Sequence, residues 1–157
     1  MRVILDSTEY ISDYNFVGVD FTLFLGSMSD IGATLFVPLV VIQEVANHHL
    51  EDLLKAYRKA SEELRKVRRW AGDRLPTDRF ETLPSEQEIE EAGARYGDTL
   101  KERLVHEHAS ILAYPDVPHE VLVRRALFRK KPFNQAGAGY RDALIWESIL
   151  KLAVESP

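Results

Sequence analysis

The sequence contains no cysteine among its 157 residues, which excludes a disulfide scaffold, a thiolate metal site and a cysteine nucleophile. It also lacks a long hydrophobic run. The opening stretch MRVILDSTEY has one basic residue and a short apolar segment, too short for a signal peptide or a membrane span. We therefore expect a cytoplasmic protein with no part in a membrane.

An excess of positive charge is absent as well. The chain has 20 Lys and Arg against 25 Asp and Glu, a formal net charge of −5. A protein that coats nucleic acid without selectivity is usually basic, so this balance argues against that class. It is compatible with a local basic surface beside a centre built from carboxylates. Hydrophobic residues make up 45% of the chain, and the length fits one domain over residues 1–157.

Apolar segments with strand and helix character alternate along the chain. Buried strands are expected at 2–6, 33–37 and 109–113. Helices are expected at 18–32, 38–70, 86–107 and 119–131, and from 139 to the end of the chain. Ser85 followed by Glu88 predicts a capping box, and the two longest helices are expected to form an antiparallel hairpin. This alternation favours an α/β fold with a parallel sheet.

Three acids interrupt otherwise apolar sequence: Asp6, Glu44 and Asp142. Asp6 ends the first strand, where ligands gather in open parallel sheets. Glu44 interrupts VPLVVIQEV, and Asp142 begins the apolar face of the last helix. Each acid has a local explanation, either a hydrogen bond in a turn or a favourable place near a helix N-terminus. The three together have a single explanation, a shared divalent cation.

Electrostatics support this single explanation. Two carboxylates 4 Å apart repel each other by roughly 4 kcal/mol at an effective dielectric constant of 20, and a cation converts that repulsion into binding. Carboxylate oxygens are hard ligands that suit Mg²⁺ or Mn²⁺. The sequence therefore predicts a metal site of Asp6, Glu44 and Asp142.

Basic and aromatic side chains accompany the last of these acids. The cations that could bind phosphates are Arg124, Arg125, Arg129, Lys130, Lys131 and Arg141. Phe133, Tyr140 and Trp146 are aromatic candidates for stacking on bases, although Trp146 is expected to pack in the interior.

The segments VILDST, VPLVVIQEV and KKPFNQAGAGYRDALIWES resemble the PIN-domain nucleases, and the last is most similar to a bacterial PIN-like branch. The resemblance covers essentially the whole chain. It implies a three-layer α/β/α fold with a short central parallel sheet, and an endoribonuclease that uses Mg²⁺ or Mn²⁺ to hydrolyse RNA, single-stranded rather than duplex. By motif position, Asp6, Glu44 and Asp142 match the family's catalytic and metal-binding acids. Ser7 or Thr8 matches a small polar residue that supports the first acid.

One departure from the family pattern concerns the C-terminal end. Family members usually follow the last helix with a further strand and a fourth acid, whereas this sequence stops at Pro157. We therefore expect a C-terminally truncated domain with an open sheet edge, which a second copy or a partner protein would cover. The sequence leaves open whether such a protein is the toxin of a toxin–antitoxin pair or a processing nuclease.

Other classes compete with this interpretation. Glu44 with His48, and Glu102 with His106, are spaced i,i+4, but di-iron bundles use Glu-x-x-His at i,i+3. A phosphoacceptor of the response-regulator kind needs an adjacent acidic pair, which DSTEY does not provide. The main rival is a catalytically inactive PIN-like module that acts as a binding partner or scaffold.

Overall fold

A short parallel sheet lies at the centre of the molecule. The computed structural model describes residues 1–72, 83–136 and 138–154. Within them the order is β1 (Arg2–Val3), α1 (Ser7–Ile11), α2 (Val19–Asp30), β2 (Thr34–Pro38), α3 (Leu39–Ala71), α4 (Glu86–Ala94), α5 (Tyr96–His106), β3 (Ser110–Leu112), α6 (His119–Leu127) and α7 (Tyr140–Val154). The strands pair in the order β1-β2-β3, all parallel. The predicted α/β fold with a parallel sheet is confirmed.

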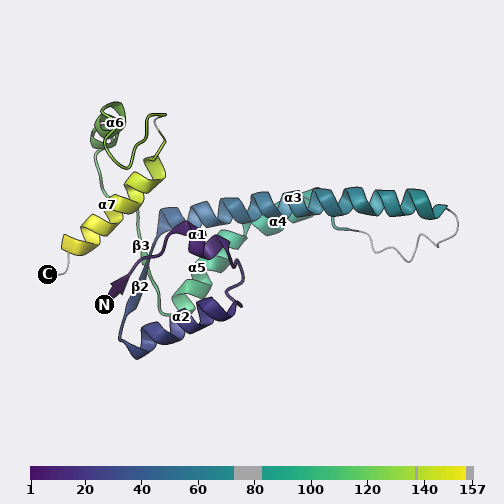
Figure 1. Cartoon of the computed structure of the whole chain (residues 1–157), viewed down its shortest axis with the longest axis horizontal. Helices are drawn as coiled ribbons and strands as arrows, with labels where there is room; N and C mark the ends of the chain where they lie inside the picture. The colour runs from purple at the N-terminus through teal and green to yellow at the C-terminus, as the bar shows by residue number, and fades with distance from the viewer. Residues whose placement is uncertain (73–82, 137, 155–157) are drawn as a thin grey trace.

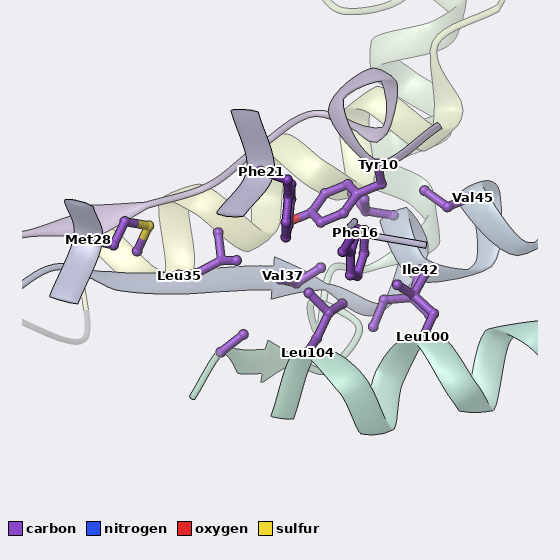
Figure 2. Packing of buried hydrophobic residues seen from close by; sticks show 12 residues of the cluster. Tyr10, Phe16, Phe21, Met28, Leu35, Val37, Ile42, Val45, Leu100 and Leu104 are labelled. Atoms are coloured by element: carbon purple, nitrogen blue, oxygen red, sulfur yellow. The ribbon is translucent and has the colours of Figure 1, made fainter. Parts of the chain in front are cut away.

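The main core joins the sheet to the helices that cover it. Leu35 and Val37 on β2 are buried, and so are Leu100 and Leu104 on α5. Aromatic side chains from the first part of the chain close the cluster, as Figure 2 shows: Tyr10, Phe16 and Phe21. Burying each large apolar side chain contributes about 1.5–3 kcal/mol, so these contacts hold the strands and helices together.

The helices form layers around the sheet and one long projection. In Figure 1, α7 lies to one side of the strands, and α2 and α5 lie to the other. Helix α3 has 33 residues, about 50 Å at 1.5 Å per residue, and extends away from the sheet with α4 beside it. Arg58 on α3 is ion-paired with Glu86 on α4 at 2.7 Å, which joins the two helices of the predicted hairpin.

Three predicted elements differ from the structure. The helix expected over residues 119–131 ends at Leu127, and Arg129 has a φ of +51° that ends the helical path. The helix expected over residues 86–107 begins with the predicted capping box at Ser85, but it is divided at Arg95 into α4 and α5. Gly93 and Gly97 flank this division, and glycine is a poor helix former. The first strand is shorter than expected, because Asp6 caps α1, a five-residue helix where only a turn was expected.

Helix α7 is held against the sheet and against α6. The Arg2 guanidinium of β1 donates a hydrogen bond to the Leu152 carbonyl at 2.8 Å. Arg125 of α6 forms an ion pair with Glu147 of α7. Leu122, Phe133 and Ala143 form a second, smaller buried cluster between these helices. Both ends of α7 are therefore fixed, and its first turn faces the C-terminal end of β1. Within the described residues, none of the helices combines the length and the apolar character needed to cross a membrane.

Candidate active site

Asp6 occupies the position where β1 gives way to α1. Its carboxylate accepts a hydrogen bond from the Ser7 backbone N–H at 2.8 Å, which makes it the N-cap of α1. The hydroxyls of Ser7 and Thr8 approach the same carboxylate at 3.5 Å and 3.4 Å, long distances for hydrogen bonds between oxygens. The structure thus places both predicted supporting residues beside Asp6. The Asp6 side chain itself remains exposed.

Asp142 lies in the first turn of α7 and is also exposed. The turn is closed by a hydrogen bond of 2.9 Å from the Ala143 N–H to the Gly139 carbonyl. Asp142 and Asp6 line one cavity of about 610 Å³, although 136 residues separate them in the sequence. The other lining residues are Ile4, Leu5, Lys131, Pro132, Ile145, Trp146 and Ile149. Two of the three predicted acids therefore face the same concave surface.

Glu44 is placed differently. It lies in the second turn of α3, its side chain is only 13% exposed, and it is ion-paired with Arg141 at 2.6 Å. Glu44 is not among the residues that line the cavity. It connects to the site through Arg141, the immediate neighbour of Asp142. Arg141, predicted to bind phosphate, therefore already has a carboxylate partner.

The remaining predicted phosphate-binding residues follow α6. Arg129, Lys130 and Lys131 are exposed, and Lys131 reaches the cavity beside the two aspartates. Positive charge at this rim would attract a phosphate backbone toward the carboxylates, in a salt-dependent manner.

The three aromatic residues predicted to stack on bases differ in how deeply they are buried. Phe133 is 4% exposed and belongs to the small cluster between α6 and α7, whereas Tyr140 is largely exposed. Trp146 was expected to pack in the interior, but it is 50% exposed and lines the cavity. Helical periodicity placed Trp146 on the apolar face of α7 correctly. It could not show that this face borders a cavity.

A comparison with known protein families identifies the family of this chain. A family model described as a PIN domain matches residues 3–157. The chain belongs to the PIN-domain family. No curated protein and no solved structure matches the chain. PIN domains are generally nucleases and typically use divalent metal ions.

This PIN domain offers a divalent cation two carboxylates on one cavity, not the three that the sequence predicts. Over residues 1–72, 83–136 and 138–154, no group of three or more His, Asp and Glu side chains could hold a metal ion. Mg²⁺, however, usually keeps several waters and binds through one or two carboxylates together with substrate phosphates. Asp6 and Asp142 are two exposed carboxylates that line one cavity, which is the number of protein carboxylates that such a site uses. The histidine-containing pairs of α3 and α5 form no such group either.

Proposed function

We propose that this PIN domain is an endoribonuclease that hydrolyses phosphodiester bonds with the help of Mg²⁺ or Mn²⁺. The observation that carries the proposal is the shared cavity of Asp6 and Asp142, with Lys131 at its rim. The family assignment supports nuclease chemistry in general. The choice of RNA as substrate rests on the sequence resemblance to PIN-domain ribonucleases.

Each residue of the site has a distinct task in this proposal. Asp6 and Asp142 would hold the cation, which supplies the positive charge that activates water and offsets the charge developing on the phosphate. The Ser7 backbone N–H orients the Asp6 carboxylate at 2.8 Å, and the hydroxyls of Ser7 and Thr8 lie beside it. Glu44 holds Arg141, and through it the first turn of α7, in place.

Lys131 would bind the substrate phosphate next to the two aspartates, and Arg129 and Lys130 would extend this contact along the backbone. Such contacts position the phosphodiester without forming covalent bonds to it. Most of the rate enhancement would then come from positioning and electrostatic stabilisation.

Cleavage of an end-labelled single-stranded RNA tests the proposal. We expect cleavage with Mg²⁺ or Mn²⁺ that stops when a chelator is added. Asp142→Asn keeps the shape of the side chain but removes its charge, so we expect a loss of about 100-fold or more in the cleavage rate. Unaltered cleavage by this variant would refute the role of Asp142.

Asp98→Asn is a matched control. Asp98 is the third residue of α5, as Asp142 is of α7, and it is also exposed. Both substitutions remove an acid from the first turn of a helix and so cost a similar small amount of helix stability. Only the substitution at Asp142 should abolish cleavage.

Two observations favour the alternative of an inactive binding module. Glu44 is paired with Arg141, and the described part of the chain holds no group of three acids suited to a metal. An inactive module would show no rise in melting temperature with Mg²⁺ or Mn²⁺, whereas a metal-binding site raises it by mass action. Metal-independent stability together with a tight complex to another protein would support this alternative.

A further inference from the structure

Trp146 is an exposed aromatic side chain that lines the same cavity as the two aspartates. It follows Asp142 by four residues on α7, so the two side chains lie on one face of the helix. Its ring lines the cavity and is 50% exposed. A Trp that served only to fill the core would be covered by its neighbours.

Two chemically different kinds of side chain line the cavity. Asp6, Asp142 and Lys131 supply charge, whereas Ile4, Leu5, Ile145, Ile149 and Trp146 supply apolar surface. Small-molecule sites typically combine an apolar lining with a few placed polar groups, in volumes of about 300–1,000 Å³. At about 610 Å³, this cavity falls within that range. A nucleotide has matching parts, a charged phosphate and a flat base with apolar faces.

We propose that Trp146 is a stacking platform for the base adjacent to the phosphate held at Asp6 and Asp142. This inference rests on the proposed function and assigns a base-binding role to one residue of its site; it requires that the base be unpaired and free to leave its neighbours. A base inside a duplex already has both faces covered by stacking, and extracting it has an energetic cost. The Trp146 platform therefore selects unpaired RNA at the point of cleavage.

The charges of the cavity favour a nucleotide over an apolar protein segment. A protein segment that covered Trp146 would also take Asp6 and Asp142 out of water without supplying a cation, which is unfavourable. A nucleotide brings phosphate oxygens that share a divalent cation with these carboxylates. Lys131 then faces the phosphate as its counter-charge.

Tryptophan fluorescence tests the proposal directly, because the chain has only two tryptophans. Trp70 lies exposed near the far end of α3, so Trp70→Phe leaves Trp146 as the only indole reporter. We would mix this variant with oligoadenylate in the presence of Mg²⁺ and record the fluorescence by stopped flow, so that binding is observed before cleavage. We expect saturable quenching. An abasic ribose-phosphate oligomer of equal length should bind weakly and leave the fluorescence unchanged.

Affinity measurements complete the test. Stacking of one base on an aromatic side chain corresponds to a loss of about 5- to 150-fold in affinity on substitution by alanine. We expect Trp146→Ala to weaken oligoadenylate binding within that range and to leave binding of the abasic oligomer unchanged. Trp146→Phe keeps an aromatic face and should retain most of the affinity, which separates lost stacking from a misfolded protein. Trp70→Ala should bind like the parent.

Several outcomes would overturn the inference. The abasic oligomer would then quench the fluorescence as strongly as oligoadenylate does, or Trp146→Ala would bind oligoadenylate as tightly as the parent does. Alternatively, duplex RNA would bind as tightly as single-stranded RNA, or RNA would leave the fluorescence unchanged. A change that depends on protein concentration without RNA would show a second copy covering Trp146, and would also overturn it. Chelator-sensitive cleavage lost in Asp142→Asn but unaffected by Trp146→Ala would leave the nuclease proposal standing and remove only the stacking platform.

Discussion

At the scale of single residues, the backbone conformation of Gly139 determines where α7 begins. Its φ of +123° is a conformation that side-chain-bearing residues rarely adopt, and an added Cβ would lie 2.6 Å from the Pro132 carbonyl oxygen. We expect Gly139→Ala to reduce the free energy of unfolding by about 2–3 kcal/mol, measured by urea denaturation. Because Asp142 depends on this turn, cleavage should also fall.

Gly26→Ala is the matched control for that prediction. Gly26 lies within α2, and an added Cβ would meet no atom within 4 Å. Alanine is the better helix former, so this substitution should stabilise the protein by about 0.5–1 kcal/mol. Equal effects of the two alanine substitutions would contradict the strain assigned to Gly139.

His49 makes the stability of the protein depend on pH. Its ring stacks on Tyr96 with ring centroids 3.8 Å apart. Burial lowers the pKa of His49 below its ordinary 6.5, and the nearby Asp52 carboxylate opposes this only in part. The unfolded chain therefore binds the proton more readily than the folded one, so stability is fully present above pH 6.5 and falls as the pH drops below it.

Melting temperatures between about pH 7.5 and pH 5 would measure this dependence. His49→Phe keeps an aromatic ring and should flatten the decline. His106→Gln, at the exposed end of α5, should leave it as in the parent. An undiminished decline in His49→Phe would assign the effect to other groups.

The capping box of α4 is a prediction at the scale of the element. The Ser85 hydroxyl accepts a hydrogen bond from the Glu88 N–H at 3.2 Å, and the Glu88 carboxylate accepts one from the Ser85 N–H at 2.7 Å. Ser85→Ala should destabilise the first turn of α4 by about 1 kcal/mol, seen as faster amide hydrogen exchange at Glu88 and Ile89. Ser85→Thr retains a capping hydroxyl and should restore most of the protection; equal exchange in both variants would argue against the cap.

Elements differ in how well local sequence predicts them. The helical spacing of apolar residues in α3 and the Ser85 cap depend only on nearby residues, so both were predictable from the sequence. The division at Arg95 and the short helix α1 were not, because each depends on how neighbouring segments pack. Gly93, for example, contacts Leu50 so closely that an added Cβ would lie 2.5 Å from the Leu50 side chain.

For the whole molecule, we predict that copies of the chain associate with one another. In the part of the chain that the structure describes, β1 pairs with β2 alone, so its other edge has no neighbouring strand. An unpaired strand edge offers free backbone N–H and C=O groups and tends to pair with another chain. We expect the mass measured by light scattering to rise with protein concentration. A constant monomer mass over the accessible range would contradict this expectation.

The candidate active site joins residues that lie far apart in the sequence. Asp6 and Asp142 were recognisable from sequence because each interrupts an apolar pattern at the end of one element or the start of another. The cost of isolated carboxylates predicted that they meet, and the structure shows that both line one cavity although they lie 136 positions apart. The predicted absence of a further strand and acid concerns positions after Val154, outside the described residues.

The sequence by itself determined the alternation of strands and helices, the capping box and the family, because these depend on local periodicity and short motifs. Only the tertiary structure decided that Glu44 pairs with Arg141 and that Trp146 faces a cavity. Ion pairing and exposure depend on which segments pack against each other. That packing is set by the burial of the whole core and not by the residues next to Glu44 or Trp146.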